Sequence, residues 1–274
     1  MIEMRASSFD QSISPWEPRI FNHELAPGDP LRGGVLMLGN FDGFHRGHRA
    51  LAAQARRLSC GRPVGMMSCE PHPRAFFRTE PEPFRLTTPG SKARMLTGAG
   101  VDFVYQPHFD GAFAGQTPEE FVQTVLVDGL GVSHVVVGPD FRFGCKRAGD
   151  LAALRKMGQA FGFGVSTAAK LACKGSDVSS TRIRKLIRAG QMAEALELLG
   201  GHWIIETTRG PDGDLRMEAS LCQPCPGRYR ARVSGLARSP LEIGIDIETN
   251  GGVLPRSPLQ TAERLFFQIT GQHG

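Results

Sequence analysis

The sequence lacks a long apolar run. No stretch of its 274 residues approaches the roughly 18 consecutive apolar residues of a membrane span. Residues 1–30 contain acidic residues, prolines and arginine but no apolar core, unlike a signal peptide. We therefore expect a protein that is neither inserted in a membrane nor secreted, and hence cytoplasmic.

The sequence also lacks the cysteine pattern of a disulfide framework. Its six cysteines are scattered, which is typical of reduced thiols in a cytosolic protein. Only Cys222 and Cys225 have the spacing of zinc ligands, and no second pair accompanies them. We interpret this spacing as chance, and the sequence assigns no protein ligands to a metal ion.

A concentrated block of basic charge is absent as well. The formal net charge is +5, but Lys and Arg are spread along the chain, with no RRM-like aromatic signature and no helix-turn-helix pattern. A moderate excess of basic over acidic residues suits a pocket for polyanionic nucleotides. We therefore expect small-molecule nucleotides as partners, rather than nucleic acid or a membrane.

What the sequence does contain is a turn rich in glycine and histidine, residues 39–48. The apolar run 35–38 before it predicts a buried parallel strand, and residues 49–58 after it predict a helix. Glycines in such a turn let a ligand approach the backbone, and the N-terminus of the helix favours phosphate. The context therefore indicates a phosphate-binding strand–turn–helix unit.

His45 and His48 are three residues apart, so both rings project from one side of this helix N-terminus. Two imidazoles there can donate hydrogen bonds to phosphate oxygens as negative charge develops, which suits phosphoryl or nucleotidyl transfer. The alternatives are a helix cap or a metal-binding pair, although a metal would need a third ligand that nothing nearby supplies.

Strand-like and helix-like segments alternate over residues 33–201. Further strands are predicted at 64–68, 101–105, 132–137 and 164–167, and further helices at 117–129, 151–161 and 191–199. This alternation predicts an α/β fold with a doubly wound parallel sheet, in which ligand loops gather at the carboxyl ends of the strands. Residues 78–90 are rich in Pro and Thr, and we expect a mobile loop there.

Three later segments carry polar residues at such positions. In residues 71–73 two prolines fix the direction of a histidine, although alone this would be an ordinary turn. Residues 140–142 combine an acid, an aromatic ring and an arginine, which could recognise a nucleotide or merely pack in a turn. Residues 179–182 cap a second helix, and their hydroxyls and guanidinium could also hold phosphates.

These segments resemble a known family. Residues 39–48, Gly-Asn-Phe-Asp-Gly-Phe-His-Arg-Gly-His, resemble the HxGH signature of nucleotidylyltransferases, in the form found in prokaryotic bifunctional riboflavin kinase/FMN adenylyltransferases (FAD synthetases). The other three segments are similar to later motifs of that family and follow in the same order. The sequence departs from the family at Cys69, where an aromatic residue is usual. Leu86-Thr87 followed by Lys92 is a weaker match, and Lys92 alone would be a solvated helix charge.

The resemblance implies an enzyme that transfers AMP from ATP to the phosphate of FMN, giving FAD and pyrophosphate, with Mg²⁺ held largely by phosphate oxygens. Its implied catalytic residues are His45, His48 and Arg182. The residues implied for ATP binding are Gly39, Asn40, Phe41, Asp42, His45, His48, Asp140, Ser179, Thr181 and Arg182. Those implied for flavin binding are Pro71, His72, Pro73, Phe141 and Arg142.

The riboflavin kinase module of the family is represented incompletely. Its Gly-Arg-x-x-Gly-Phe-Pro-Thr-Ala-Asn type marker is absent, although residues 202–274 are β-rich and residues 226–231 faintly resemble a strand of the kinase barrel. Strands are predicted at 203–208, 215–221, 228–234 and 241–247. We expect a shortened remnant without kinase activity. Glu242 or Glu263 could be a kinase base, but an exposed strand charge explains each better.

The expected organisation is an N-terminal extension (1–32), a Rossmann-like nucleotidylyltransferase domain (33–201) and a small β-rich domain (202–274). Two other functions stay open, namely a non-catalytic flavin- or nucleotide-binding regulatory paralogue, and a nucleotidylyltransferase of the same fold with another substrate. The retained histidines argue against the first and the retained flavin motifs against the second. The sequence predicts no oligomeric state.

Overall fold

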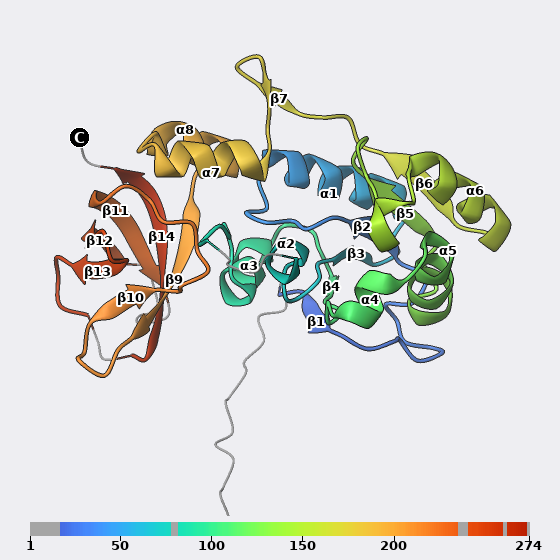
Figure 1. The fold of residues 1–274 in the computed structure, drawn as a ribbon, viewed down its shortest axis with the longest axis horizontal. Helices are drawn as coiled ribbons and strands as arrows, with labels where there is room; N and C mark the ends of the chain where they lie inside the picture. The colour runs from blue at the N-terminus through green and yellow to red at the C-terminus, as the bar shows by residue number, and fades with distance from the viewer. Residues whose placement is uncertain (1–16, 78–81, 235–240, 260–261, 273–274) are drawn as a thin grey trace, which may run out of the picture.

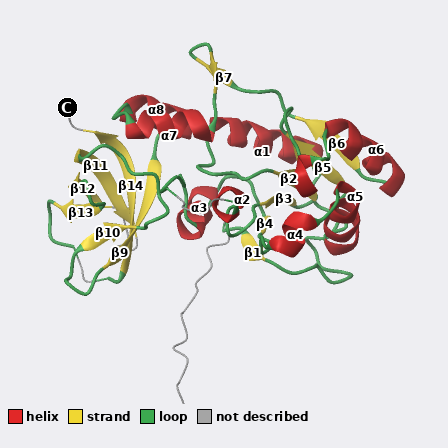
Figure 2. Cartoon of the chain, viewed as in Figure 1, coloured by secondary structure: helices red, strands yellow, loops and turns green. Residues whose placement is uncertain are grey.

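The computed structural model describes residues 17–77, 82–234, 241–259 and 262–272, which form two parts (Figure 1). A six-stranded sheet with helices around it forms one end of the molecule, and a closed barrel forms the other. Figure 2 shows the helices gathered around the sheet and along one side of the barrel. No helix in these ranges is long and apolar enough to cross a membrane.

The sheet is parallel throughout, with the order β1-β4-β3-β2-β5-β6. Its strands are β1 (Arg19–Phe21), β2 (Val35–Leu38), β3 (Val64–Met67), β4 (Phe103–Tyr105), β5 (His134–Val137) and β6 (Gly164–Thr167). The strand order reverses between β2 and β5, and ligands bind at such switch points in doubly wound sheets. The predicted fold class is confirmed.

Alternate side chains of the strands face two layers of helices. Met37 and Val136 belong to a core shared with α1 (Arg46–Leu58) and α3 (Pro89–Leu96). Leu36 and Val135, their neighbours along the strands, belong to a second core with η1 (Val122–Gly129) and α6 (Leu151–Phe161). Because both faces of the sheet are covered, its strands are almost continuously apolar.

The predicted helices form, and the first residues of several carry the expected caps. Thr117 and Glu120 make a capping box at α5 (Pro118–Phe121), which continues directly into η1. The remaining helical segments are α2 (Pro73–Phe76), α4 (Gly111–Gly115), η2 (Cys145–Arg147), α7 (Ser180–Arg188) and α8 (Met192–Leu199). A short hairpin, β7 (Ala172–Cys173) and β8 (Ser176–Asp177), precedes α7.

Part of the expected N-terminal extension is built into the sheet. Residues 19–21 form β1, which pairs in parallel with β4 and buries Phe21. Arg32 donates hydrogen bonds to carbonyl groups at the end of η1, which ties the following turn to the domain. A strand of three residues with one buried side chain has too little periodicity to be recognised in a sequence. Residues 1–16 lie outside the described part of the chain.

The expectation of a mobile loop at 78–90 is wrong for the residues that the structure describes. Phe84 and Arg85 donate their amide N–H groups to the Ser220 carbonyl in the barrel. Residues 84–88 are buried, and Pro89 and Gly90 already belong to α3. The composition of this segment suggested a loop. The residues that bury it lie far away in the sequence, so their contacts could not be predicted from the segment itself. Residues 78–81 lie outside the described ranges.

Six antiparallel strands close the barrel, where the sequence predicted four. In order around the barrel they are β10 (Leu215–Met217), β13 (Gly252–Pro255), β12 (Leu241–Ile247), β11 (Gly227–Ser234), β14 (Arg264–Gln272) and β9 (Trp203–Arg209). The short β13 was missed because it begins with Gly and ends with Pro, both of which are turn signals. β14 was missed because polar residues and a glycine interrupt its apolar ones.

The barrel core is continuous with the last two helices before it. Ile187 of α7 and Leu199 of α8 pack in the same buried cluster as Ile205 of β9. Trp203 is fully buried there, and its indole Nε1 donates to the Leu86 carbonyl at 2.7 Å. Segment 84–88 is therefore bonded both to the barrel and to Asp42 in the turn after β2.

We predict that Trp203→Phe lowers the free energy of unfolding by about 2 kcal/mol, because it leaves the buried Leu86 carbonyl without a donor and opens a small gap. Urea denaturation followed by circular dichroism measures this. Leu241→Ala is the control, since Leu241 is exposed on the same barrel. Equal unfolding midpoints for the two variants would contradict the described role of Trp203.

Candidate active site

Two adjacent cavities open at the carboxyl ends of the sheet strands. The first, of about 480 Å³, is lined by the turn after β2, the start of α2 and the start of α7, and we call it the histidine cavity. The second, of about 570 Å³, has six phenylalanines in its lining, and we call it the aromatic cavity. Asn40 and Arg74 line both cavities, so the two meet at these residues.

His45 and His48 stand together at the start of α1. His45 is the N-cap of the helix, and its Nδ1 accepts the His48 amide N–H at 3.4 Å. Because Nδ1 is the acceptor, the proton of the neutral ring lies on Nε2. The two rings stack with their centroids 3.6 Å apart. Gly47 allows this arrangement, since a Cβ at that position would lie only 3.2 Å from the His45 ring.

His72 uses its ring in the same way at a second helix. It is the N-cap of α2, and its Nδ1 accepts the Arg74 amide N–H at 3.0 Å. Its Nε2 therefore carries the proton, and this buried atom has no hydrogen-bond partner in the described part of the chain. The sequence indicated His72 for the flavin, whereas the structure places it in the histidine cavity.

Burial keeps these imidazoles neutral at pH 7. Desolvation lowers the pKa of His45 and that of His72 to about 4, against the attraction of the Asp42 carboxylate. Desolvation and the neighbouring His45 ring hold the pKa of His48 well below its usual value. The histidine cavity therefore offers N–H donors without imidazolium charge, and a bound polyanion would raise these pKa values.

Asp42 holds the turn after β2 in place. Its buried carboxylate accepts the Leu86 amide at 2.9 Å, the Thr87 amide at 3.0 Å and the Arg184 Nη2 at 2.8 Å. Burial alone would raise the pKa of Asp42, but the charge and hydrogen bond of Arg184 hold it below its ordinary value. The sequence indicated Asp42 as an ATP ligand. Because protein groups occupy its carboxylate, the residue positions the turn instead.

The predicted catalytic Arg182 does not line the histidine cavity. Its guanidinium donates to carbonyls of the β7–β8 hairpin and to Glu194 of α8 at 2.6 Å. Arg184 lines the cavity instead, and it also donates to the Phe84 carbonyl at 2.6 Å. Residues two apart face different sides of a helix, which explains why one arginine turns toward the cavity and the other away.

The start of α7 forms the opposite wall of the histidine cavity. Ser179 caps the helix by accepting the Arg182 amide at 3.3 Å, and Ser180 Oγ donates to the Asp42 carbonyl at 2.8 Å. Thr181 lines the cavity in the first turn. The N-termini of α1 and α7 therefore both face this cavity, and their partial positive charges favour an anion there.

The aromatic cavity brings together most of the residues predicted for the flavin. Of the residues predicted for the flavin, Pro73, Phe141 and Arg142 line it. Gly39 and Asn40, which were predicted for ATP, line it as well. Its other aromatic residues are Phe77, Phe109, Phe113, Phe121 and Phe143. The rings of Phe141 and Phe143 are stacked, with centroids 5.6 Å apart. Its apolar walls suit a planar ring, whereas the histidine cavity suits phosphates.

Three predicted residues lie elsewhere or play a packing role. Asp140 is 75% exposed, forms an ion pair with Lys170 at 2.5 Å and lines neither cavity. Pro71 lines neither cavity as well. Phe41 borders the histidine cavity, but its buried ring packs against His48 at 5.1 Å between centroids.

Comparison with known proteins identifies the family. The profile of the family described as FAD synthetase matches residues 29–182, which is more than half of the chain. The chain belongs to the FAD synthetase family.

Relatives of this FAD synthetase family member match beyond that segment. The chain is 38% identical over 232 residues to the bifunctional riboflavin kinase/FMN adenylyltransferase of Escherichia coli K12, covering 80% of this chain and 74% of the relative. It is 35% identical over 208 residues to an FAD synthetase of Listeria monocytogenes, covering 75% and 84%. A solved structure of a macrolide-efflux protein from Streptococcus pneumoniae matches with a TM-score of 0.76, over 93% of this chain and 90% of that one. At 22% identity, this last likeness shows the fold alone.

Lys92 is a residue of this FAD synthetase family member that sequence reasoning undervalued. It is buried, and its Nζ donates to the Asn40 carbonyl at 3.3 Å and to the Ser68 hydroxyl. Burial lowers its pKa to about 8, with a further contribution from the charge of Arg85. Its position one turn into α3 looked like a solvated site. The weak family match was the signal that pointed to it.

We predict that acidification destabilises the protein partly through His45. Below about pH 6.5 the unfolded chain protonates this residue, whereas the folded protein does so only near pH 4, so the free energy of unfolding falls as the pH falls between these values. His45→Asn keeps a helix-capping group but cannot titrate. Between pH 7 and pH 5 the variant should lose about 2 kcal/mol less stability than the wild type in urea denaturation. An identical loss in both proteins would contradict the neutral, buried state of His45.

Proposed function

We propose that the protein is an FMN adenylyltransferase, which transfers AMP from ATP to FMN and forms FAD and pyrophosphate. The observation that supports this most directly is the meeting of the two cavities at Asn40 and Arg74. One cavity offers donors for phosphates and the other offers aromatic walls for a planar ring. The names of the Escherichia coli and Listeria relatives support the same substrates.

The phosphates of ATP bind in the histidine cavity in this proposal. The helix N-termini of α1 and α7 supply backbone N–H groups, and His45 supplies an Nε2–H. The Arg184 guanidinium borders the same cavity, where it is paired with the Asp42 carboxylate. Asn40, Ser179 and Thr181 line the same cavity. We do not assign Asp140 and Arg182 to ATP binding, because both lie apart from this cavity.

The transfer itself needs no protein nucleophile. A phosphate oxygen of FMN attacks the α-phosphorus of ATP and forms the new P–O bond, while the bond from this phosphorus to the bridging oxygen breaks and pyrophosphate leaves. The FMN phosphate is already ionised at neutral pH, so no strong base is required. His45 and His48 donate hydrogen bonds to oxygens that gain negative charge in the transition state, where such donors act most strongly.

The flavin ring of FMN occupies the aromatic cavity. Phe141, Phe143 and Pro73 give it apolar contacts, and Arg142 lies at the same wall. Its phosphate lies where the two cavities meet, near Asn40 and Arg74. This arrangement brings the attacking phosphate next to the histidine cavity, as an in-line transfer requires.

Mg²⁺ is part of the proposal as an ion bound by the phosphates of ATP. In the described ranges, the carboxylate that borders the histidine cavity belongs to Asp42, and protein donors already occupy it. Asn40 offers a neutral amide oxygen there. Mg²⁺ prefers oxygen ligands and commonly binds through substrate phosphates with few protein ligands, so this donor set fits such an ion. It would neutralise phosphate charge when bound.

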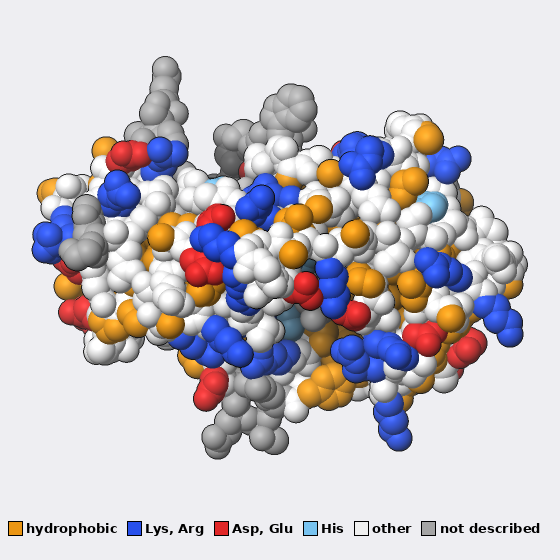
Figure 3. All heavy atoms as spheres, turned by 90° about the horizontal axis from the view of Figure 1, so that it is seen from above, with side chains coloured by type: hydrophobic (Ala, Val, Ile, Leu, Met, Phe, Trp, Pro, Cys, Tyr) orange, Lys and Arg blue, Asp and Glu red, His pale blue; other side chains and the backbone are white. Residues whose placement is uncertain are grey.

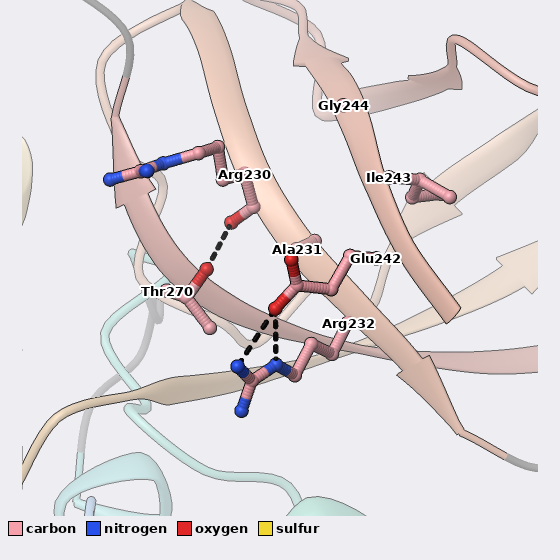
Figure 4. Close-up of a pocket in the computed structure, with 7 residues that line it drawn as sticks. All are labelled: Arg230, Ala231, Arg232, Glu242, Ile243, Gly244 and Thr270. Atoms are coloured by element: carbon pink, nitrogen blue, oxygen red, sulfur yellow. Dashed lines mark hydrogen bonds and ion pairs between the residues drawn. The ribbon is translucent and has the colours of Figure 1, made fainter. Parts of the chain in front are cut away.

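We also propose that the barrel, residues 202–274, has no riboflavin kinase activity. Beyond the missing sequence marker, the exposed Glu242 is held by Arg232, whose Nε donates to its carboxylate at 2.8 Å (Figure 4). This contact is what an exposed charge on a strand makes with its cross-strand neighbour, and it does not mark Glu242 as a catalytic base. Lys and Arg side chains are interspersed with acidic ones across the face in Figure 3, and we propose no nucleic-acid partner.

The test is a chromatographic assay of the purified protein with ATP and Mg²⁺, with FMN in one reaction and riboflavin in another. We expect FAD and pyrophosphate from FMN, and neither FMN nor FAD from riboflavin. His48→Ala should lower kcat for FAD formation by roughly 10²-fold, since it removes a transition-state donor. His23→Ala, an exposed histidine away from both cavities, should leave kcat unchanged.

Three results would contradict the proposal. Flavin or nucleotide binding without FAD formation would favour a regulatory role. Products from riboflavin would show an active kinase in the barrel. An unchanged kcat in His48→Ala would show that His48 does not stabilise the transition state.

A further inference from the structure

The buried ammonium group of Lys92 joins the ends of two neighbouring strands. Its Nζ donates to the carbonyl of Asn40, two residues after β2, at 3.3 Å, and to the hydroxyl of Ser68, the residue after β3. The Ser68 hydroxyl donates in turn to the Asn40 carbonyl at 3.4 Å. The two strands are paired up to Leu38 and Met67. Lys92 therefore completes a network of three groups at the carboxyl edge of the two central strands.

This ammonium group is buried without a carboxylate in contact. The carboxylates whose charges act on it belong to Asp42 and Glu70. Asp42 is bonded to Arg184 instead, and Glu70 to Arg85. Within the described ranges, Lys92 therefore donates to neutral oxygens. A buried cation without an ion pair costs stability, and such groups are found most often at functional sites.

The bond from Lys92 reaches the junction of the two cavities through Asn40. Asn40 is exposed and borders both cavities, whereas Lys92 borders neither. Because the carbonyl of Asn40 is held by Lys92 and Ser68, its place at the junction is set from the buried side. A hydrogen bond from a charged donor is stronger than one between neutral groups. Loss of the ammonium group should therefore loosen Asn40 at the point where a ligand would meet it.

We propose that Lys92 is a positioning residue for adenylyl transfer, whose buried ammonium group fixes Asn40 where the FMN phosphate meets the phosphates of ATP. This deepens the proposed function and rests on it. Lys92 does not touch the substrates and acts through Asn40. A small misplacement of reacting groups lowers the rate of a transfer strongly. Loss of Lys92 should therefore lower kcat more than it weakens substrate binding.

The test is a double-mutant cycle in kcat for FAD formation from FMN, ATP and Mg²⁺. Lys92→Met keeps an unbranched apolar side chain but has no ammonium group. We expect Lys92→Met and Asn40→Ala each to lower kcat about 10-fold. The double variant should lie within about 3-fold of Asn40→Ala, whereas independent losses would multiply to about 100-fold. In Lys92→Met the KM values for ATP and FMN should change less than about 3-fold.

Lys156→Met is the matched control, because Lys156 is exposed on α6 and borders neither cavity. It should keep the wild-type kcat.

Lys92→Met should also keep its melting temperature, since it leaves no carboxylate unpaired and the Asn40 carbonyl retains the Ser68 hydroxyl as a donor. If Lys92→Met does not fold, Ser68→Ala takes its place in the cycle, because it loosens the same network by removing one hydroxyl. Ser68→Ala should lower kcat about 3-fold in the wild type and leave it unchanged in Asn40→Ala.

Two kinds of result would overturn the inference in distinguishable ways. If the wild type forms FAD but Lys92→Met keeps its kcat, or its loss multiplies with that of Asn40→Ala, the role of Lys92 is wrong while the proposed function stands. If the wild type forms no FAD from FMN, the proposed function fails and the inference fails with it.

Discussion

The buried carboxylate of Asp42 is the constraint on which the site depends. It accepts hydrogen bonds from the backbone of residues 86 and 87 and from Arg184, which are distant in the sequence. A buried carboxylate is tolerated only when charge and hydrogen bonds replace water. These donors therefore fix the turn after β2, the segment before α3 and the start of α7 relative to one another. The same segment 84–88 is bonded to the barrel through Trp203, so the barrel supports the site from outside.

Neutral donors are the second feature of the site. His45 and His72 are both helix N-caps that accept a backbone N–H at Nδ1, and this leaves each Nε2 with its proton. Because their pKa values are low, the two rings add no positive charge to the cavity at neutral pH. The donors are oriented before a substrate arrives, and such preorganisation is the main source of electrostatic catalysis.

Much of the fold and part of the site could be predicted from the sequence. The strand–turn–helix unit at His45 and His48 was predictable because its signals are local, namely an apolar run, glycines and a helix-forming run. The roles of Asp42 and Lys92 were not, because both depend on partners far away in the sequence. The choice between Arg182 and Arg184 depends on how α7 is rotated, which is set by packing against the barrel.

The central claim is that Asp42 and Arg184 act as one buried pair that assembles the site. A double-mutant cycle with Asp42→Asn, Arg184→Met and the double variant, measured as free energies of unfolding in urea, tests it most directly. We predict that each single variant loses about 3 kcal/mol and that the double variant loses at least about 2 kcal/mol less than the sum. Losses that add to within about 0.5 kcal/mol would show that the two residues act independently, and would contradict the account.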